Sequence, residues 1–203
     1  MKKLKSALNR IFIDGLSGMA LGLFSTLIVG TILTQVATLF LGGAAKNLLL
    51  TVGKTASLLT GAGIGCGVAG KLKASPLVTV ASAVNGMVGA YAGKILAGTL
   101  ISDGAFTILP PGEPLGAFVA AYVGIAVGSL ISGKTKVDIL LTPVTTILCG
   151  SAVGIFVGPP ISEFMTYLGS LVNWGTQQQP FLMGIVVSVL MGIFLTLPIS
   201  SAT

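Results

Sequence analysis

Glu113 is the residue best placed to do chemistry, because it lies between Pro111 and Pro114 in the stretch LPPGEPLG. The prolines stiffen the backbone and prevent a helix from forming ahead of Leu115, which holds the carboxylate at a helix entrance. A carboxylate held there can accept two hydroxyl hydrogen bonds from a polyol, and such charge-assisted bonds are roughly twice as strong as neutral ones. We therefore predict that Glu113 and Gly112 bind a solute. The alternative is a rigid outer loop with a solvated glutamate.

Two other features of the sequence are candidates for the same site. Asn85 lies on a stripe of small residues at four-residue spacing, and an amide in such a stripe either ties two helices together or faces a polar cavity. Residues 61–70 contain five glycines, which is typical of the broken or re-entrant helices that line transporter sites. A short tilted span packed by its glycines is the alternative for this segment. On the first interpretation, Asn85, Gly63 and Gly65 contact substrate.

Enzymatic chemistry is narrowly bounded, because the chain contains no histidine and only five acidic residues. Without histidine, a Ser-His-Asp triad, a histidine metal site and a phosphohistidine relay within this polypeptide are excluded. We expect no catalytic residue, no metal ligand and no cofactor in this chain.

The composition is that of a membrane protein. Charged residues make up 8% of the chain and apolar residues 53%, and the mean hydropathy is +1.01, whereas soluble domains are roughly 25% charged. A spanning helix needs about 20 mostly apolar residues. Runs that meet or approach this length cover residues 11–41, 55–70, 74–93, 115–132, 139–162 and 181–199. We predict an all-α polytopic membrane protein with about six hydrophobic segments, that is, five or six transmembrane helices and, as the open alternative, a re-entrant piece.

The basic residues predict the orientation, since cytoplasmic loops carry the excess of Lys and Arg. With the N-terminus in the cytoplasm, eight of the 11 basic residues lie on that side. This distribution accounts for the net charge of +6 without nucleic acid, so we expect no nucleic-acid partner. We divide the chain into an amphipathic interfacial helix over residues 1–13, for which a disordered basic tail is the alternative, and a transmembrane domain over residues 14–203.

A second irregular region runs from Phe164 to Pro180. It carries no charge, but its end is too polar to cross a membrane. We expect an amphipathic or re-entrant piece at the outer interface, with Trp174 as an interfacial anchor.

Five stretches together resemble a known family: RIFIDGLSGMALGLFSTLIVGT (10–31), PGEPLGA (111–117), KVDILLTP (136–143), GPPISEF (158–164) and QPFLMGIVVSVLMGIFLTLPISSA (179–202). They are similar to the EIIC-like membrane proteins of the phosphotransferase system, a family that includes perfringolysin O regulator proteins. The resemblance implies a multi-pass protein of the bacterial inner membrane that carries a sugar or related hydroxylated solute. In this system phosphate reaches the sugar from separate domains, so soluble phosphotransferase components are the implied partners. Family members are longer, and we expect this chain to contain the N-terminal half of their fold.

Two functions follow as hypotheses. The first is a permease subunit that binds and translocates a sugar or polyol at Glu113, Asn85 and the glycine-rich segment, without a phosphorylation domain of its own. The second is a membrane-bound sensor or regulator of gene expression that does not transport and works through the basic face formed by Lys71, Lys73, Lys134, Lys136 and the N-terminal helix. The lipid bilayer is a partner in both, and self-association into a homo-oligomer is left open.

Overall fold

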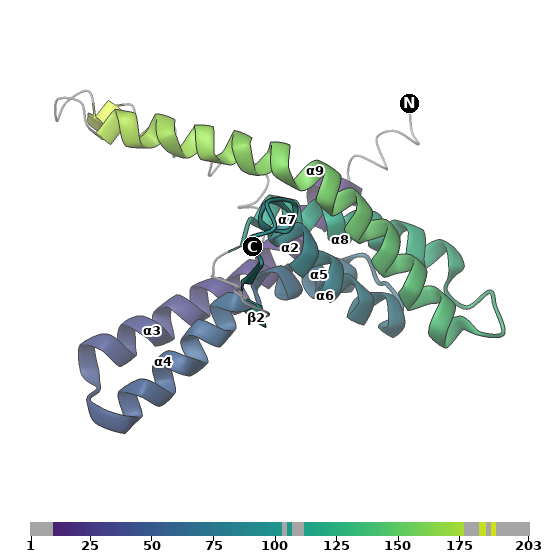
Figure 1. The fold of residues 1–203 in the computed structure, drawn as a ribbon, viewed down its shortest axis with the longest axis horizontal. Coiled ribbons are helices and arrows are strands. Elements are labelled where there is room, and N and C mark those ends of the chain that lie inside the picture. The colour runs from purple at the N-terminus through teal and green to yellow at the C-terminus, as the bar shows by residue number, and fades with distance from the viewer. Residues whose placement is uncertain (1–9, 103–104, 107–111, 177–182, 186–187, 190–203) are drawn as a thin grey trace.

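The computed structural model describes residues 10–102, 105–106, 112–176, 183–185 and 188–189 of the 203-residue chain. These residues are mainly helical (Figure 1). In chain order the elements are η1 (Arg10–Gly15), α2 (Leu16–Leu23), η2 (Phe24–Ile28), α3 (Val29–Phe40), α4 (Gly43–Leu58), α5 (Thr60–Lys71), α6 (Pro76–Ala90), α7 (Ala92–Leu96), β1 (Ile101–Ser102), β2 (Ala105–Phe106), α8 (Pro114–Ile131) and α9 (Asp138–Thr176). In this part of the chain the strands are limited to β1 and β2, which pair antiparallel. The predicted all-α class is confirmed at this level.

Three helical stretches are long and apolar enough to cross a membrane: Arg10–Phe40, Pro114–Ile131 and Asp138–Ser170. A fourth crossing is formed if α4 and α5, which meet at an angle of 55°, count as one span. Within the described residues α6 is apolar but has only 15 residues. The structure thus supports three or four spans, while the predicted total of about six segments and the cytoplasmic N-terminus stay predictions. Most of the apolar run over residues 181–199 lies outside the described residues.

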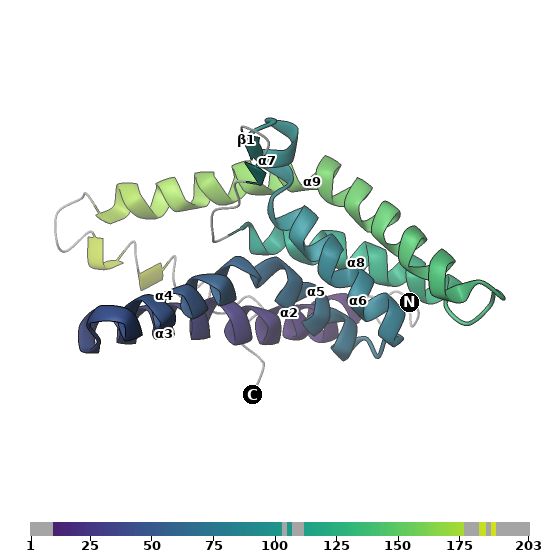
Figure 2. The same ribbon diagram turned by 60° about the horizontal axis from the view of Figure 1, so that its bottom comes forward.

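The helices divide into a packed bundle and a projecting hairpin. Helices α2, α5, α6, α8 and α9 contact one another, whereas α3 and α4 pack together and extend away from the bundle (Figures 1 and 2). Many large apolar side chains on the outer faces are exposed, and Phe40 and Phe156 reach 78% and 79%. Such surfaces suit contact with lipid rather than water.

Glycines set the spacing of the bundle. A Cβ atom added to Gly18 of α2 would lie 2.6 Å from the carbonyl oxygen of Gly67 in α5, and one added to Gly61 would lie 2.6 Å from the carbonyl oxygen of Gly86 in α6. Real Cβ atoms do not approach so closely, so these glycines allow direct backbone contact. The glycine-rich segment is therefore a regular helix, α5, and the break in the α4–α5 pair lies just before it, at Leu59.

In the region from Phe164 to Pro180, residues 164–176 continue helix α9, and residues 177–180 lie outside the described residues; an amphipathic or re-entrant piece at the outer interface stays a prediction. Helix α9 continues without interruption from Asp138 to Thr176, over 39 residues. Pro159 and Pro160 lie inside it, and Figure 2 shows the helix bent near its middle. A proline removes one backbone hydrogen bond and kinks a helix, and the apolar residues that follow allow the helix to resume. Trp174 is exposed at the end of α9, and its role as an interfacial anchor stays a prediction.

The N-terminal region begins as helix in the part that the structure describes. Residues 10–13 belong to η1 and continue into α2. The rest of the predicted amphipathic helix, residues 1–9, lies outside the described residues.

Candidate functional site

Glu113 caps the N-terminus of α8. Its Oε1 accepts a hydrogen bond from the Leu115 N–H at 3.4 Å, and Pro114 occupies the first position of the helix. Both features are typical of helix starts. The first N–H groups of a helix need acceptors from outside the helix, and proline has no backbone N–H that would need one. The Glu113 N–H donates to the carbonyl oxygen of Ala90 at 2.8 Å. This bond fixes the residue against the end of α6, and the carboxylate lies at a helix entrance as the prolines predict.

Gly112 allows this close approach. A Cβ atom at this position would lie 2.6 Å from the Ala90 Cβ and 3.1 Å from the Tyr91 Cζ. Any larger residue would push the segment before α8 away from α6. Gly112 therefore sets the position of the Glu113 carboxylate.

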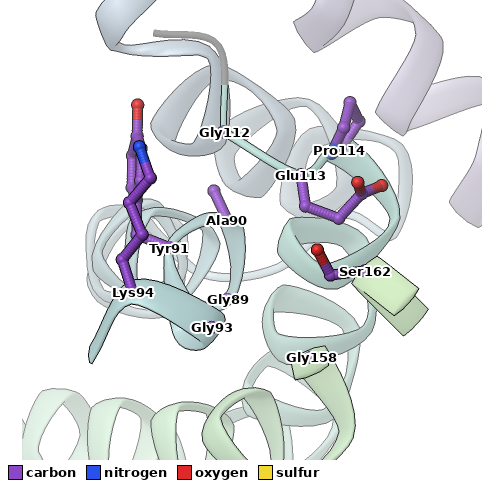
Figure 3. A pocket seen from close by; sticks show the side chains of 10 residues that line it. All are labelled: Gly89, Ala90, Tyr91, Gly93, Lys94, Gly112, Glu113, Pro114, Gly158 and Ser162. Carbon is purple, nitrogen blue, oxygen red and sulfur yellow. The ribbon is translucent and has the colours of Figure 1, made fainter. Parts of the chain in front are cut away.

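A pocket of about 420 Å³ lies beside this contact (Figure 3). It is formed by the end of α6, by α7, by the start of α8 and by the middle of α9. Its lining residues are Gly89, Ala90, Tyr91, Gly93, Lys94, Gly112, Glu113, Pro114, Gly158 and Ser162. Figure 3 shows Glu113 and Ser162 on one side of the pocket and Tyr91 and Lys94 on the other.

The Glu113 carboxyl is half-buried, and this burial raises its pKa above the ordinary value, while the hydrogen bond from Leu115 acts in the opposite direction. Among the described residues no cation forms an ion pair with it. The carboxylate thus retains the capacity to accept hydrogen bonds from a ligand.

The opposite side of the pocket supplies donors. The Lys94 Nζ lies 5.5 Å from the centroid of the Tyr91 ring, in a cation–π contact. The Tyr91 side chain is 3% exposed, and within the described part of the chain its hydroxyl has no hydrogen-bond partner. A buried hydroxyl without a partner is unusual. Together with the Ser162 hydroxyl, these groups give the pocket donors as well as an acceptor.

Asn85 lies elsewhere. Its side chain is fully buried, its Nδ2 donates to the carbonyl oxygen of Thr146 at 2.9 Å, and its Oδ1 accepts from the Ser151 Oγ at 3.2 Å. The amide therefore joins α6 to α9. The sequence left open whether Asn85 ties two helices together or faces a polar cavity. In this conformation Asn85 ties two helices together.

Gly63 and Gly65 also lie away from the pocket. A Cβ atom on Gly63 would lie 2.5 Å from the Cγ2 of Thr26, and one on Gly65 would overlap the carbonyl oxygen of Ser82. Both glycines are occupied by contacts between α5 and its neighbours. The structure thus brings together Glu113 and Gly112 and separates them from Asn85, Gly63 and Gly65, whose contact with a substrate stays a prediction. The described residues include no cluster of three or more acidic or cysteine side chains that could hold a metal ion.

A family model described as "Phosphotransferase system, EIIC" matches residues 13–203, which is nearly the whole chain. The chain belongs to this family. The match and the long apolar helices make it an integral membrane protein and a permease-type subunit of a phosphotransferase system. No curated protein and no solved structure matches the chain.

Most residues that line the pocket of the EIIC chain were not predicted as site residues from the sequence, among them Tyr91, Lys94, Gly158 and Ser162. A signal for two of them was present, because Gly158 and Ser162 belong to the stretch GPPISEF, which contributes to the family resemblance. For Tyr91 and Lys94 the sequence showed only that a basic residue, Lys94, follows the apolar run over residues 74–93. Their role depends on how α7 folds back beside α9, which no local pattern indicates.

Proposed function

We propose that this EIIC chain binds and translocates a sugar or a related hydroxylated solute, and that the pocket beside Glu113 is the binding site. The observation that carries the proposal is a half-buried carboxylate that lines a pocket and has no ion-pair partner among the described residues. A neutral solute with adjacent hydroxyls could donate two hydrogen bonds to this carboxylate and accept others from Tyr91, Lys94 and Ser162.

The size of the pocket supports this assignment. Its volume of about 420 Å³ lies within the range of roughly 300–1,000 Å³ common for small-molecule sites. The lining combines small residues, one aromatic ring and a few polar groups. Such a lining gives a ligand both apolar contact and fixed hydrogen-bond directions.

The wider setting is part of the same proposal. We place the protein in the bacterial inner membrane with its N-terminus in the cytoplasm, and we expect soluble phosphotransferase components to supply phosphate, since this polypeptide contains no histidine to carry it. In the conformation described, Asn85 joins α6 to α9, while Gly63 and Gly65 pack α5 against its neighbours. Whether they also contact the solute during translocation stays a prediction, as does self-association.

The first test replaces Glu113 by Gln and measures thermal unfolding of the detergent-solubilised chain with a panel of sugars and polyols. Binding to the folded state raises the unfolding midpoint by mass action. Loss of one charge-assisted hydrogen bond, worth roughly 1.5–3 kcal/mol, predicts an affinity at least about tenfold lower in Glu113→Gln. Glu163→Gln is the matched control, because Glu163 is an exposed glutamate of α9 that does not line the pocket.

The result also separates the two functional hypotheses. A carrier should show a midpoint shift with one class of solute, reduced in Glu113→Gln and kept in Glu163→Gln. A regulator that works only through its basic face should show no shift with any solute. Equal shifts in both variants would assign binding to another part of the protein.

The pH dependence provides an independent prediction. Because burial raises the pKa of Glu113 in the folded state, the folded chain binds this proton more tightly than the unfolded chain does. The associated stability is therefore complete below the unfolded-state pKa and is lost as the pH rises through the folded-state pKa. Solute affinity should change in the opposite direction across that window, since only the ionised carboxylate accepts two hydroxyl bonds. Unfolding and binding titrations of the wild type should show both trends, and Glu113→Gln should show neither.

A further inference from the structure

A second cavity, of about 450 Å³, lies against another part of α8. Arg10 of η1 borders it on one side and Leu72, in the turn after α5, on another. The α8 residues that line it include Tyr122, Ala126 and Ser129, whose spacing of three and four residues places them on one face of the helix. This cavity shares no lining residue with the pocket beside Glu113.

Its lining is mixed in character. Ile125 is buried at the base, and Leu130, which also lines the cavity, is 66% exposed. Both belong to Pro114–Ile131, one of the helices able to cross a membrane. The lining therefore combines two parts: a cationic group from η1, and apolar side chains on a helix that is long and apolar enough to cross a membrane. A soluble anion would use only the first of these two parts.

Positive charge is concentrated at this end of the bundle. The turn between α5 and α6 carries Lys71 and Lys73, and the turn between α8 and α9 carries Lys134 and Lys136, all four exposed. A hydrogen bond of 2.8 Å between the Ser75 and Ser132 hydroxyls joins the two turns. Figures 1 and 2 both show these turns at the end of the bundle opposite the α3–α4 loop.

Two acidic side chains oppose this charge only in part. Asp138 accepts hydrogen bonds from the Gly133 N–H at 3.0 Å and from the Thr142 hydroxyl, and so it is occupied in closing the turn before α9. Asp14 is exposed on the same helical stretch as Arg10. Within the described residues Arg10 forms no ion pair. Five basic residues against two acids leave this end of the bundle positive.

We propose that this groove binds an anionic glycerophospholipid, with the phosphate at Arg10 and the Ser129 hydroxyl, toward the basic turns, and the start of an acyl chain along Ala126, Ile125 and Tyr122, toward the middle of α8. Basic pockets between membrane helices bind anionic headgroups in this way. The arginine guanidinium supplies paired N–H donors that match phosphate oxygens. The bound lipid would bridge η1, the α5–α6 turn and α8.

The test measures thermal unfolding of the detergent-solubilised 203-residue chain with added dioleoylphosphatidylglycerol, dioleoylphosphatidylcholine or glycerol phosphate. Phosphatidylglycerol should raise the unfolding midpoint, while phosphatidylcholine, which has the same acyl chains but no net charge, and glycerol phosphate, which has no acyl chain, should have little effect. Arg10→Gln should lower the apparent affinity for phosphatidylglycerol about fivefold, as expected for the loss of one basic side chain near an anionic surface. Lys46→Gln, in α4 of the projecting hairpin, removes the same charge and should leave the affinity unchanged.

A second variant examines the apolar part of the groove. Ala126 is exposed, so Ala126→Trp should fold normally while filling the groove and removing the shift caused by phosphatidylglycerol. Equal shifts with both lipids, or an unchanged affinity in Arg10→Gln, would overturn the proposal. A shift with glycerol phosphate equal to that with phosphatidylglycerol would replace the lipid by a soluble anion and overturn it as well.

Discussion

Gly65→Val should strongly reduce the fraction of protein molecules that fold into the native bundle. A Cβ atom at Gly65 would overlap the Ser82 carbonyl oxygen and lie 3.0 Å from the Cα of Ala83, so the clash is with the backbone of α6. Neither helix can relieve it by moving a side chain. The same crossing contains the hydrogen bond from the Ser82 Oγ to the Gly65 carbonyl oxygen at 2.9 Å, which separation of the helices would break. We expect the free energy of unfolding to decrease by about 3 kcal/mol or more, at the upper end of the effects of overpacking.

Gly70→Val is the matched control for this prediction. Gly70 lies in the same helix, but a Cβ atom there would meet nothing within 4 Å. The free energy of unfolding of Gly70→Val should differ from that of the wild type by no more than about 0.5 kcal/mol, as for most surface substitutions. Size-exclusion profiles and thermal unfolding of both variants measure the difference. A similar loss in the two variants would mean that α5 and α6 are not in backbone contact.

Asn85→Ala should destabilise the bundle without acting selectively on solute binding. The substitution removes a fully buried side chain and both of its hydrogen bonds, to Thr146 and from Ser151. Loss of buried hydrogen bonds and creation of a cavity together predict a decrease of about 2–3 kcal/mol in the free energy of unfolding. Asn47→Ala provides the comparison, because Asn47 is exposed on α4 and its loss should have little effect.

The outcome for Asn85 distinguishes its two uses. A residue that ties α6 to α9 should leave the folded fraction of Asn85→Ala with nearly normal solute affinity. Preserved stability combined with lost affinity would instead assign Asn85 to the solute site. Unfolding and binding therefore have to be measured on the same preparation.

The sequence predicted the start of α8 well, because the signals there are local. The prolines of LPPGEPLG predicted a helix that starts at about Leu115 with Glu113 at its entrance, and α8 begins one residue earlier, at Pro114, with Glu113 as its cap. The prediction of membrane helices was also independent of tertiary contacts, because it came from the apolar composition and the lengths of the uncharged runs.

Other parts depended on contacts that a single sequence does not reveal. The five glycines of residues 61–70 left open a broken or re-entrant helix and a short tilted span packed by its glycines. The break lies just before them, at Leu59, while α5 itself is a regular helix whose glycines make close contacts with α2 and α6. The sequence from Phe164 to Pro180 did not indicate that its first part continues the preceding helix, yet α9 extends to Thr176 past Pro159 and Pro160. The pocket itself joins the end of α6 to Ser162, more than 70 residues further along the chain. Only the folded arrangement brings these groups together.

The most direct test of the solute site is protection of a cysteine placed in it. Ser162→Cys would be made in a chain whose two native cysteines are replaced, by Cys66→Ser and Cys149→Ser, and labelled with a small water-soluble thiol reagent in the presence of each sugar or polyol. If the solute occupies the pocket beside Glu113, one class of solute should slow the labelling, and the added change Glu113→Gln should abolish that protection. If no solute slows the labelling, or if the protection persists in Glu113→Gln, the pocket is not the solute site.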